Sequence, residues 1–479
     1  IKTNFIRITG YTPVHYVAPG GGNTIPYTNW NTASHSIAAA MDEAETFDTI
    51  YVSNGTYGVP MLGLLFTDGI TLMAVNGPSN TIITGGGSES VIAANFYNIE
   101  PTLIDGFTIT NGYAGGDAGG AWLTRNVTLQ NSIITGCAAG DDGGGIYMSG
   151  GVVSNCLVVA NAAGGGGGGI YVRDGGTVTH CRVIGNASTN GGGGIYVYST
   201  NPAIASLLQS CTVVSNSTGK VTENGGGIYA WRCLVRNCLI VTNQAYRGGG
   251  LYSAFSDVIN CTIAGNDATH GGGLSIESVS TARNCIVWGN TRSNLYQVSG
   301  VVLDYCDVSP ATTGNGNLNA DPLFADTSTG NWNLAISSPC VDSGTNLLAC
   351  DMGGVPRPLD GNFDGTNVCD IGAFEFIHPE ADSDGDHQRD IDEWPAGTDP
   401  LDGASFLGIF SLVRGAGADM VLRWSSVSGK VYRIENVTCP GTTHVWEKAV
   451  GAITSTPPQN VYTGSTEILG SQMYRIGLE

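Results

Sequence analysis

Charged residues are scarce in this chain of 479 residues: Asp, Glu, Lys and Arg together make up only 12%. Basic residues are the rarer kind, with 19 Lys and Arg against 40 Asp and Glu, so the formal net charge is -21. Nucleic acid and anionic membrane surfaces would be repelled by such a chain. We therefore predict no nucleic-acid partner, and an acidic polysaccharide could bind only with the help of cations.

Long apolar runs are also missing. No stretch of roughly 18 or more apolar residues occurs, so no membrane span is predicted. The sequence starts at Ile1 rather than Met and carries no signal peptide, which suggests a chain that has already been processed. With its low charge and its many small polar residues, we expect a secreted or extracellular protein that can be associated with the cell surface.

Low charge does not mean disorder here, because 42% of the residues are apolar. Glycine is abundant, with 72 residues, whereas the 18 prolines are an ordinary share. This composition is typical of a β-rich repeat protein with many tight turns. The 13 cysteines are an odd number, and seven of them follow a repeat better than they follow a disulfide framework.

The repeat is a cysteine followed five residues later by an asparagine, with copies that begin 23 to 30 residues apart. The cysteines are Cys156, Cys181, Cys211, Cys238, Cys261 and Cys285, and the asparagines are Asn161, Asn186, Asn216, Asn243, Asn266 and Asn290. A second strand-like run follows the glycines, as in Gly169-Ile170-Tyr171, and a third precedes each cysteine. Three short strands per roughly 24 residues predict one coil of a parallel β-helix.

Stacked coils about 4.8 Å apart would arrange equivalent residues in ladders. Cys and the Ile or Leu after the glycines should point inward, and the following Tyr should point outward. A column of cysteines fills a narrow core, so we expect free thiols, although neighbouring coils would also allow disulfides. The corner Asn can bond its neighbours above and below, and the glycines allow positive φ and close approach of the coils.

These GGGIY and NCxIxxN strands resemble the repeats of bacterial secreted and surface right-handed parallel β-helix proteins, including the pectin-lyase-like and polymorphic outer-membrane groups. Their usual pair is GGA followed by Ile, Leu or Val, with FxxN. Here Gly replaces Ala, and Cys often replaces Phe. Such folds include enzymes, adhesins and phage components, so the resemblance implies the fold and leaves the function open.

Both ends of the repeat resemble caps of the same proteins. Residues 15–58 have Ala, Ile and Met at helical spacing, and residues 319–376 contain DPLF, SPC and DIGAFE segments. The predicted fold is all-β: an N-terminal extension (1–14), a right-handed parallel β-helix with an N-terminal helical cap and a closing segment (15–376), an acidic calcium-binding linker (377–403) and a small β-sandwich (404–479). Cys340, Cys350 and Cys369 lie in the closing segment, where one pair could form a disulfide.

The linker holds nine acidic residues and one Arg between Glu380 and Asp402. Positions 1, 3, 5, 9 and 12 of a calcium loop are occupied by Asp382, Asp384, Asp386, Asp390 and Glu393, with the Gln388 carbonyl at position 7. The segment resembles thrombospondin type-3 and EF-hand-like loops, which implies Ca²⁺ as the bound ion.

One departure weakens that resemblance, because His387 stands where an EF-hand has Gly. The backbone geometry of the loop is therefore open, and a solvated acidic linker without an ion is the alternative. Asp360, Asn362 and Asp364 form a second, weaker candidate for a metal site.

Outward aromatic residues are the most regular surface feature. The predicted stripe consists of Tyr147, Tyr171, Tyr196, Tyr229 and Tyr252. Stacking of the ladder would by itself stabilise the sheet. The alternatives are a protein interface or a platform for sugars. Outward apolar residues beside the cysteine strands, such as Val241 and Trp288, also predict a contact surface there.

The turn before the glycines carries the one polar column with candidate chemistry. Its members are Asp141, Asp142, Asn190, Glu223, Asn224, Arg247 and His270. β-Helix lyases use a basic residue to remove a proton, often with Ca²⁺, and β-helix hydrolases use a pair of carboxylates. The repeat contains one lysine, Lys220. No motif separates this column from a solvated edge, and we select Arg247 from it as a candidate binding residue.

Two functions therefore remain. The main prediction is a non-enzymatic extracellular structural or adhesive protein, which forms homo-oligomers or filaments or contacts glycans through its ladder faces. The alternative is a secreted polysaccharide lyase or glycoside hydrolase with a cleft around Asp142, Glu223, Arg247 and His270.

Overall fold

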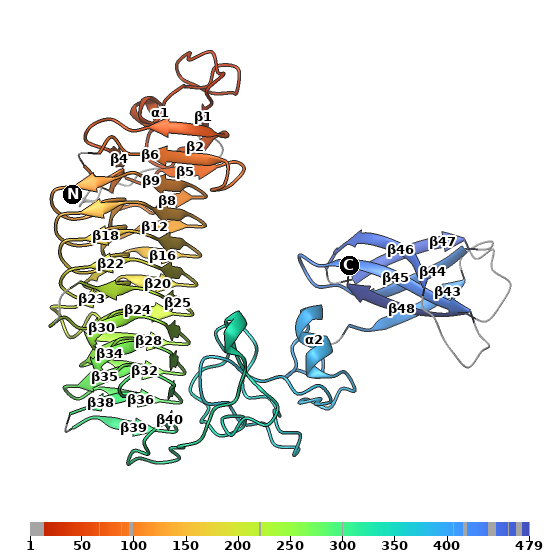
Figure 1. The fold of residues 1–479 in the computed structure, drawn as a ribbon. Coiled ribbons are helices and arrows are strands. Elements are labelled where there is room, and N and C mark those ends of the chain that lie inside the picture. Colours follow the sequence, from red (N-terminus) through yellow and green to blue (C-terminus); the bar gives the residue numbers. More distant parts are fainter. Residues whose placement is uncertain are drawn as a thin grey trace, which may run out of the picture.

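A computed structural model describes residues 14–478 apart from 67, 88, 95–98, 220–221, 299, 406, 415–418, 439–446, 458 and 466–471. The predicted extension 1–14, except for Val14, and Lys220 lie outside these residues. The chain forms a long column of stacked strands, with an irregular closing region beside its far end and a separate set of C-terminal strands (Figure 1). The predicted β-solenoid is confirmed, with about 10 turns.

Four parallel sheets run along the column. Sheet 1 contains β1 (Val14–Val17), β2 (Thr49–Val52), β5 (Thr71–Ala74), β8 (Thr102–Asp105), β12 (Val127–Gln130), β16 (Val152–Ser154), β20 (Thr177–Thr179), β24 (Ser206–Gln209), β28 (Cys233–Arg236), β32 (Asp257–Ile259), β36 (Thr281–Arg283) and β39 (Val302–Asp304). Sheet 2 contains β3 (Gly55–Gly58), β6 (Thr81–Thr84), β9 (Thr108–Thr110), β13 (Ile133–Thr135), β17 (Leu157–Val159), β21 (Arg182–Ile184), β25 (Thr212–Val214), β29 (Leu239–Val241), β33 (Thr262–Ala264), β37 (Ile286–Trp288) and β40 (Asp307–Val308).

The other two sheets complete the coils. Sheet 3 contains β4 (Leu64–Phe66), β7 (Ile92–Ala94), β11 (Ala121–Thr124), β15 (Ile146–Ser149), β19 (Ile170–Arg173), β23 (Ile195–Tyr198), β27 (Ile228–Trp231), β31 (Leu251–Ala254), β35 (Leu274–Glu277) and β38 (Leu295–Gln297). The short sheet 4 contains β10 (Tyr113–Ala114), β14 (Ala138–Ala139), β18 (Ala162–Ala163), β22 (Ala187–Ser188), β26 (Ser217–Thr218), β30 (Gln244–Arg247) and β34 (Asp267–His270).

Alternation along the strands builds the core. In β19, Ile170 is buried, whereas Tyr171 and Arg173 point to the outside. Neighbouring strands pair residue for residue, so Ile146, Ile170 and Ile195 form one inward row. Complete burial of such a side chain stabilises the fold by about 1.5–3 kcal/mol. The inward rows merge into one continuous apolar core along the column.

The repeat cysteines lie in this core as free thiols, as predicted. Cys156, Cys181, Cys211, Cys238, Cys261 and Cys285 are all buried and unpaired. A carbonyl at hydrogen-bond distance accompanies each thiol; the Cys181 Sγ, for example, lies 3.3 Å from the Thr179 carbonyl. Cys340, Cys350 and Cys369 are free as well, so the suggested closing-segment disulfide does not form.

The corner asparagines form the predicted ladder. Asn186 Nδ2 donates to Asn216 Oδ1 at 3.0 Å, and the Asn186 main-chain N–H donates to the same oxygen at 2.9 Å. The same pair of bonds links each step from Asn161 to Asn290. Turn groups that would otherwise be buried without partners are satisfied in this way.

A short helix, α1 (Ile37–Glu43), lies at the N-terminal end of the column (Figure 1). The Ser36 hydroxyl accepts a hydrogen bond from the Ala39 N–H and caps its first turn. Ile37, Ala40 and Met41 are buried and belong to the same core as the first coils. The helix is therefore packed on the solenoid.

The closing region packs against sheet 2 near the far end of the column. It contains β41 (Phe324–Asp326), the 3-10 helix η1 (Thr327–Thr329) and β42 (Asn331–Leu334). Phe324 and Trp332 pack beside buried Val241, and Trp288 joins a second cluster with Ile286. The Ala373 N–H donates to the Thr262 hydroxyl at 3.0 Å. The outward apolar residues Val241 and Trp288 thus contact a later part of the same chain.

The linker carries the helix α2 (Asp390–Ala396), and two antiparallel sheets follow it. One contains β43 (Ile409–Arg414), β44 (Asp419–Ser425) and β47 (Gln459–Ser465); the other contains β45 (Val431–Thr438), β46 (Glu447–Thr454) and β48 (Gln472–Leu478). Trp424 from the first and Tyr432 from the second belong to one buried cluster. Within the described ranges, no helix is both long and apolar enough to cross a membrane.

Candidate functional site

The tyrosine ladder runs down the outer surface of sheet 3. Its rings stack pairwise with centroids 4.3 to 5.1 Å apart, and the planes are 2° to 17° from parallel. The ladder consists of Tyr147, Tyr171, Tyr196, Tyr229 and Tyr252. Because neighbours lie on successive coils, the ring faces are turned toward one another along the column.

This stacking corrects the expectation of an exposed stripe in part. Tyr147 is only 6% exposed and Tyr252 only 5%, whereas Tyr171, Tyr196 and Tyr229 are half-buried. A sugar packs best on a free ring face, and the faces inside the ladder are covered by neighbouring tyrosines. The geometry therefore favours a stabilising role for the ladder, and it leaves ring edges rather than ring faces for contact with a ligand.

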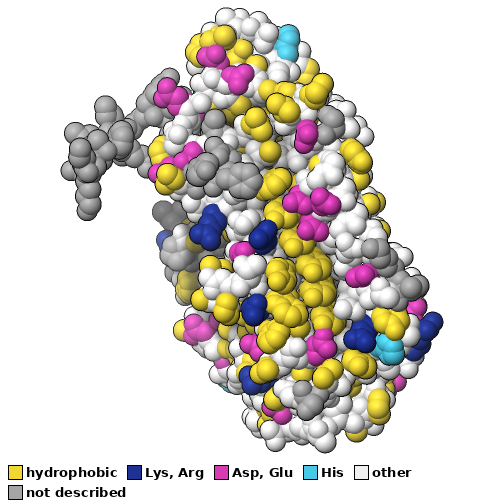
Figure 2. All heavy atoms as spheres, turned by 90° about the vertical axis from the view of Figure 1, so that its left-hand side faces the viewer, with side chains coloured by type: hydrophobic (Ala, Val, Ile, Leu, Met, Phe, Trp, Pro, Cys, Tyr) yellow, Lys and Arg dark blue, Asp and Glu magenta, His cyan; other side chains and the backbone are white. Residues whose placement is uncertain are grey.

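A second aromatic group lies beside the ladder on the same sheet. Tyr198 and Trp231 have ring centroids 6.1 Å apart, and Trp231 meets Phe255 edge-on at 4.9 Å. The Arg232 guanidinium lies 5.3 Å from the Phe255 ring centroid. In the space-filling view, a hydrophobic stripe runs down this side of the molecule, with basic side chains mostly on one flank and a cluster of acidic ones on the other (Figure 2).

Three carboxylates gather beside the upper end of the ladder. Asp141 and Asp142 lie in the turn before β15, and Asp117 lies one coil earlier. Asp117 Oδ1 accepts the Asp142 N–H at 3.0 Å, and Asp142 Oδ1 accepts the Gly166 N–H at 2.7 Å. Burial raises the pKa of Asp142; the Gly166 bond opposes this increase, and the negative charges of Asp117 and Asp141 add to it.

Arg173 completes this carboxylate cluster, which we define as Asp117, Asp141, Asp142 and Arg173. It lies at the end of β19, and its Nε is 3.5 Å from Asp174 Oδ2. A hydrogen bond to the Tyr147 side chain raises the pKa of Arg173, and Arg173 in turn stabilises the charge of Asp142. The cluster therefore combines a partly buried carboxyl, two further carboxylates and the positive charge of an exposed arginine.

The glycine run of residues 164–169 makes room for this arrangement. A Cβ on Gly165 would lie 2.3 Å from Asp142 Oδ1, and one on Gly166 would lie 2.8 Å from the Tyr196 ring. Neither glycine has positive φ, so space rather than backbone conformation requires them. The run of six glycines is thus explained in part by the carboxyl and the ring that lie over it.

Replacing Gly165 with alanine should displace the Asp142 carboxyl. We expect a loss of about 1–3 kcal/mol in the free energy of unfolding, which is the usual range for overpacking. Urea unfolding followed by circular dichroism would measure it. Gly116→Ala is the matched control, because a Cβ there meets nothing within 4 Å. Equal stability of the two variants would show that Asp142 is not held over Gly165.

The polar column exists, but it does not converge on one point. In the register of the parallel strands, Arg247 lies opposite His270 on the next coil. The backbone of Asn224 forms an isolated β-bridge with that of Arg247. Asp142, by contrast, is separated from Arg247 by four coil steps, through Gly166, Gly191 and Asn224. At about 4.8 Å per step the separation is about 19 Å. The predicted single cleft around Asp142, Glu223, Arg247 and His270 is therefore replaced by two separate groups.

The lower group is mainly aromatic. The His270 ring meets Tyr246 at 5.2 Å and Tyr296 at 5.7 Å, both edge-on. The Arg247 guanidinium lies 5.3 Å from the Tyr296 centroid, and its buried Nε has no hydrogen-bond partner. Arg247 is thus held against an aromatic ring, and Glu223 lies one coil away, where its main-chain carbonyl accepts the Tyr246 N–H at 3.0 Å.

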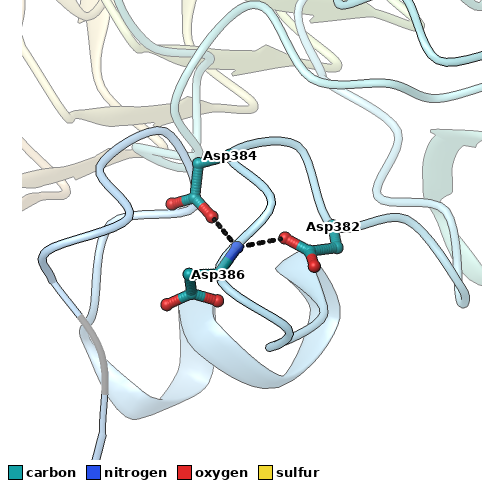
Figure 3. Close-up of side chains that lie close together, drawn as sticks. All are labelled: Asp382, Asp384 and Asp386. Carbon is teal, nitrogen blue, oxygen red and sulfur yellow. Dashed lines mark hydrogen bonds between the residues drawn. The ribbon is translucent and has the colours of Figure 1, made fainter.

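The linker brings three of its predicted ligand residues together. Asp382, Asp384 and Asp386 each offer an oxygen within 4.8 Å of the others, and no other group of at least three His, Cys, Asp or Glu ligands does so among the described residues. Asp382 and Asp384 both accept the Asp386 N–H, at 3.2 and 3.1 Å (Figure 3). These three residues could bind a metal ion.

Glu393 is an independent indication of a cation at this triad. Its side chain is fully buried in α2, and neither carboxylate oxygen has a hydrogen-bond partner. Asp384 Oδ2 and Asp386 Oδ2 are likewise buried and unpartnered. Burial raises the pKa of Glu393 to about 7, and the negative charges of Asp384 and Asp386 add to this increase. A cation would stabilise all these oxygens in their charged form.

The other predicted ligands behave differently. Both carboxylate oxygens of Asp390 accept hydrogen bonds from Ser383, at 2.8 and 2.6 Å, so Asp390 fixes the loop. The Gln388 N–H donates to Asp386 Oδ1 at 2.7 Å. His387 adopts φ 78, the left-handed conformation that glycine would supply at this position. The His-for-Gly replacement therefore leaves the turn intact.

The second candidate cluster is a hydrogen-bonded turn. Asp360 accepts the main-chain N–H groups of Asp364 and Gly365 at 3.1 and 2.9 Å, and Asn362 Oδ1 accepts from Asp364 at 3.0 Å. No unpartnered oxygen distinguishes it within the described residues. The turn explains these residues without an ion.

Sequence reasoning missed Asp117 and Arg173 in the upper cluster. Asp117 lies 25 residues before Asp142, which is one coil, so the repeat spacing could have identified it. Arg173 reaches its position from the end of a strand, and no motif marks it. Sequence reasoning also missed a pocket between sheet 2 and the closing region. This pocket is formed by Trp288, Phe324 and Trp332.

Comparisons with known proteins agree with the β-helix fold. A family model described as a right-handed beta helix region matches residues 69–232. No curated protein matches the chain in sequence. Among solved structures, pectate lyase Pel9A is similar with a TM-score of 0.50 and 16% identity, covering 76% of this chain and 96% of that one.

Two further solved structures are more distant. XylC with xylose has a TM-score of 0.32 and 10% identity, covering 70% of this chain and 67% of that chain. The catalytic domain of a GH87 alpha-1,3-glucanase with nigerose has a TM-score of 0.25 and 15% identity, covering 56% and 67%. The fold is thus a right-handed, pectate-lyase-like β-helix.

Proposed function

We propose that this protein is an extracellular glycoside hydrolase that acts on a polysaccharide chain lying along sheet 3. The observation that carries the proposal is the carboxylate cluster beside the tyrosine ladder. In this cluster, burial raises the pKa of Asp142. The fold likeness to a pectate lyase supports a carbohydrate substrate. This proposal replaces the non-enzymatic function that the sequence alone favours.

The cluster suits acid–base hydrolysis better than β-elimination. A carboxyl with a raised pKa can protonate the leaving oxygen of a glycosidic bond, and a neighbouring carboxylate can act as base or nucleophile. Elimination needs a residue that removes a proton. The only cation of the cluster is Arg173, and its hydrogen bond to Tyr147 raises its pKa, so it stays protonated. Arg173 would instead orient the substrate and the carboxylates.

A panel of neutral and acidic polysaccharides tests this proposal. Hydrolysis predicts new reducing ends without unsaturated uronates. Unsaturated products would show elimination and would contradict the assignment of Asp142. If no polymer yields a product, the non-enzymatic function stands.

That second function is favoured by one specific observation. Met61, Leu62 and Leu65 are 76%, 64% and 61% exposed at the N-terminal end of the solenoid, where contact with a neighbour would cover them. A structural or adhesive protein would self-associate there or bind glycans without cleaving them. Sedimentation and electron microscopy would show homo-oligomers or filaments, and a strictly monomeric protein would contradict self-association.

We further propose that the linker triad binds Ca²⁺, because hard carboxylate oxygens suit this ion. The buried Glu393 would be its fourth side-chain ligand. Calcium would hold α2 to the loop and so order the connection between the solenoid and the C-terminal sheets. We also propose that α1 covers the open end of the core, that the two C-terminal sheets form a sandwich over residues 404–479, and that the protein is exported.

Calcium should therefore stabilise the linker measurably. At a concentration about 100 times its dissociation constant, one bound ion contributes about 2.7 kcal/mol. We expect Ca²⁺ to protect the linker from limited proteolysis, and a chelator to reverse that protection. Asp384→Asn should lose the effect. Glu380→Gln removes the same charge from an exposed neighbour and should keep it; equal loss in both variants would indicate general screening of acidic charge.

A further inference from the structure

We propose that the pocket between sheet 2 and the closing region binds a neutral sugar residue. The pocket has a volume of about 380 Å³ and is partly open to solvent. Trp288, Phe324 and Trp332 contribute its aromatic part, and Asp321 and Thr327 contribute polar groups. This volume lies in the range of small-molecule sites.

Two chain segments far apart in sequence build the pocket. Trp288 ends β37 on sheet 2, whereas Phe324 and Trp332 lie on the hairpin strands β41 and β42. The Phe324 and Trp332 rings meet edge-on with centroids 5.2 Å apart and are both partly exposed. Unlike the tyrosine ladder, these rings do not stack face to face, so ring surface remains for a ligand.

Glycines open the solenoid side of the pocket. The residue before each ladder asparagine has positive φ; in the four coils before the pocket it is Ala160, Gly185, Ser215 and Thr242. At the pocket the same position is Gly265 or Gly289. A Cβ on Gly265 would lie 3.7 Å from the Trp332 ring, whereas one on Gly289 would meet nothing within 4 Å. Both glycines leave the wall of the pocket without side chains.

The lining specifies the ligand chemistry. Indole and phenyl rings pack against the C–H face of a pyranose, and carboxylate and hydroxyl oxygens bond to its hydroxyl groups. The Asp321 carboxylate is oriented by a hydrogen bond, because its Oδ1 accepts the Leu323 N–H at 3.0 Å. The same carboxylate would repel a uronate, and none of the described residues that line the pocket is Lys, Arg or His. We therefore assign a neutral rather than an acidic sugar.

This pocket is separate from the carboxylate cluster, which belongs to the sheet 3 side of the column. The inference therefore stands whether or not Asp142 hydrolyses a polymer. A second site of this kind would hold a neutral chain or side branch on the protein, while another part of the polysaccharide lies along sheet 3.

Binding of cellohexaose, xylohexaose and hexagalacturonate to the full chain tests the proposal. Isothermal titration and tryptophan fluorescence are the readouts. We expect at least one neutral hexaose to bind at this pocket. Hexagalacturonate should bind there at least about tenfold more weakly, and a tenfold difference in affinity corresponds to about 1.4 kcal/mol. Trp332→Ala should weaken the neutral binding about tenfold. Trp30→Ala is the matched control, since Trp30 is 42% exposed at the other end of the column.

Asp321→Asn is the second variant, because asparagine keeps the acceptor for Leu323 and should fold normally. It should reduce discrimination against hexagalacturonate. Asp142→Asn should leave this binding unchanged, which separates the pocket from the proposed active site. The proposal is overturned if neither neutral hexaose binds, if Trp332→Ala binds as the wild type does, or if hexagalacturonate competes equally for the pocket.

Discussion

Asparagine in place of Asp142 is expected to lower the rate of polysaccharide hydrolysis by at least about 100-fold, the lower range for loss of a general acid. Asparagine can still accept the Gly166 N–H that Asp142 Oδ1 accepts at 2.7 Å, so the fold should be retained. Only the transferable proton is lost. The rate of formation of reducing ends measures the effect, with thermal unfolding as the check on folding.

The pH profile gives an independent test of the same residue. Burial raises the pKa of Asp142, and a general acid acts only while it is protonated. Activity should therefore fall as the pH rises through this pKa, at a pH higher than that of an ordinary Asp. Asp257→Asn, on the exposed surface of sheet 1, is the matched control and should keep both rate and profile. A fully active Asp142→Asn variant would refute the proposed role.

The second large effect is expected at the centre of the asparagine ladder. Asn243 Nδ2 donates to the Val213, Val241 and Asn266 oxygens at 2.9 to 3.0 Å. Its Oδ1 accepts two bonds from Asn216, at 2.9 and 3.0 Å. Asn243→Ala would leave several buried polar groups unpaired, and we expect a loss of about 3–5 kcal/mol in the free energy of unfolding. Denaturant unfolding with far-ultraviolet circular dichroism measures it.

Gln244→Ala is the control for this ladder variant. Gln244 is the adjacent residue and also has an amide side chain, but it is exposed. Its replacement should change stability by less than about 0.5 kcal/mol. Because coils contact only their neighbours, Asn243→Ala should also split the transition into two phases. Equal, small losses in both variants would mean that the ladder bonds only balance the cost of desolvating the amides.

The linker loop shows how much a local sequence motif can predict. Asp382, Asp384 and Asp386 are brought together by a loop whose turns involve only nearby residues, so the sequence spacing was sufficient to predict the triad. Asp390 was predicted from the same spacing, but both of its oxygens are used by Ser383. A motif fixes which residues are near one another, but it does not fix which hydrogen bonds compete for each oxygen.

Surface chemistry was harder to predict than the fold. The alternation of β-strands correctly placed Tyr171 on the outside, yet whether its ring lies flat on the sheet or stacks on Tyr196 depends on packing between coils. The polar column is also divided into two groups, because four coil steps of about 4.8 Å lie between Asp142 and Arg247. The closing region reaches sheet 2 from 111 residues away, as in the Ala373 to Thr262 bond, and no local pattern encodes that contact.

The sequence alone determined the stacked coils, the buried cysteines and the asparagine ladder, because each is a one-dimensional repeat in which a residue meets its counterpart one coil away. Only the tertiary structure decided that the Arg173 charge acts on Asp142, that both Glu393 carboxylate oxygens are buried without a hydrogen-bond partner, and that Trp288 and Trp332 share a pocket. Those groupings depend on side-chain directions and on long-range docking of segments, and neither follows from periodicity.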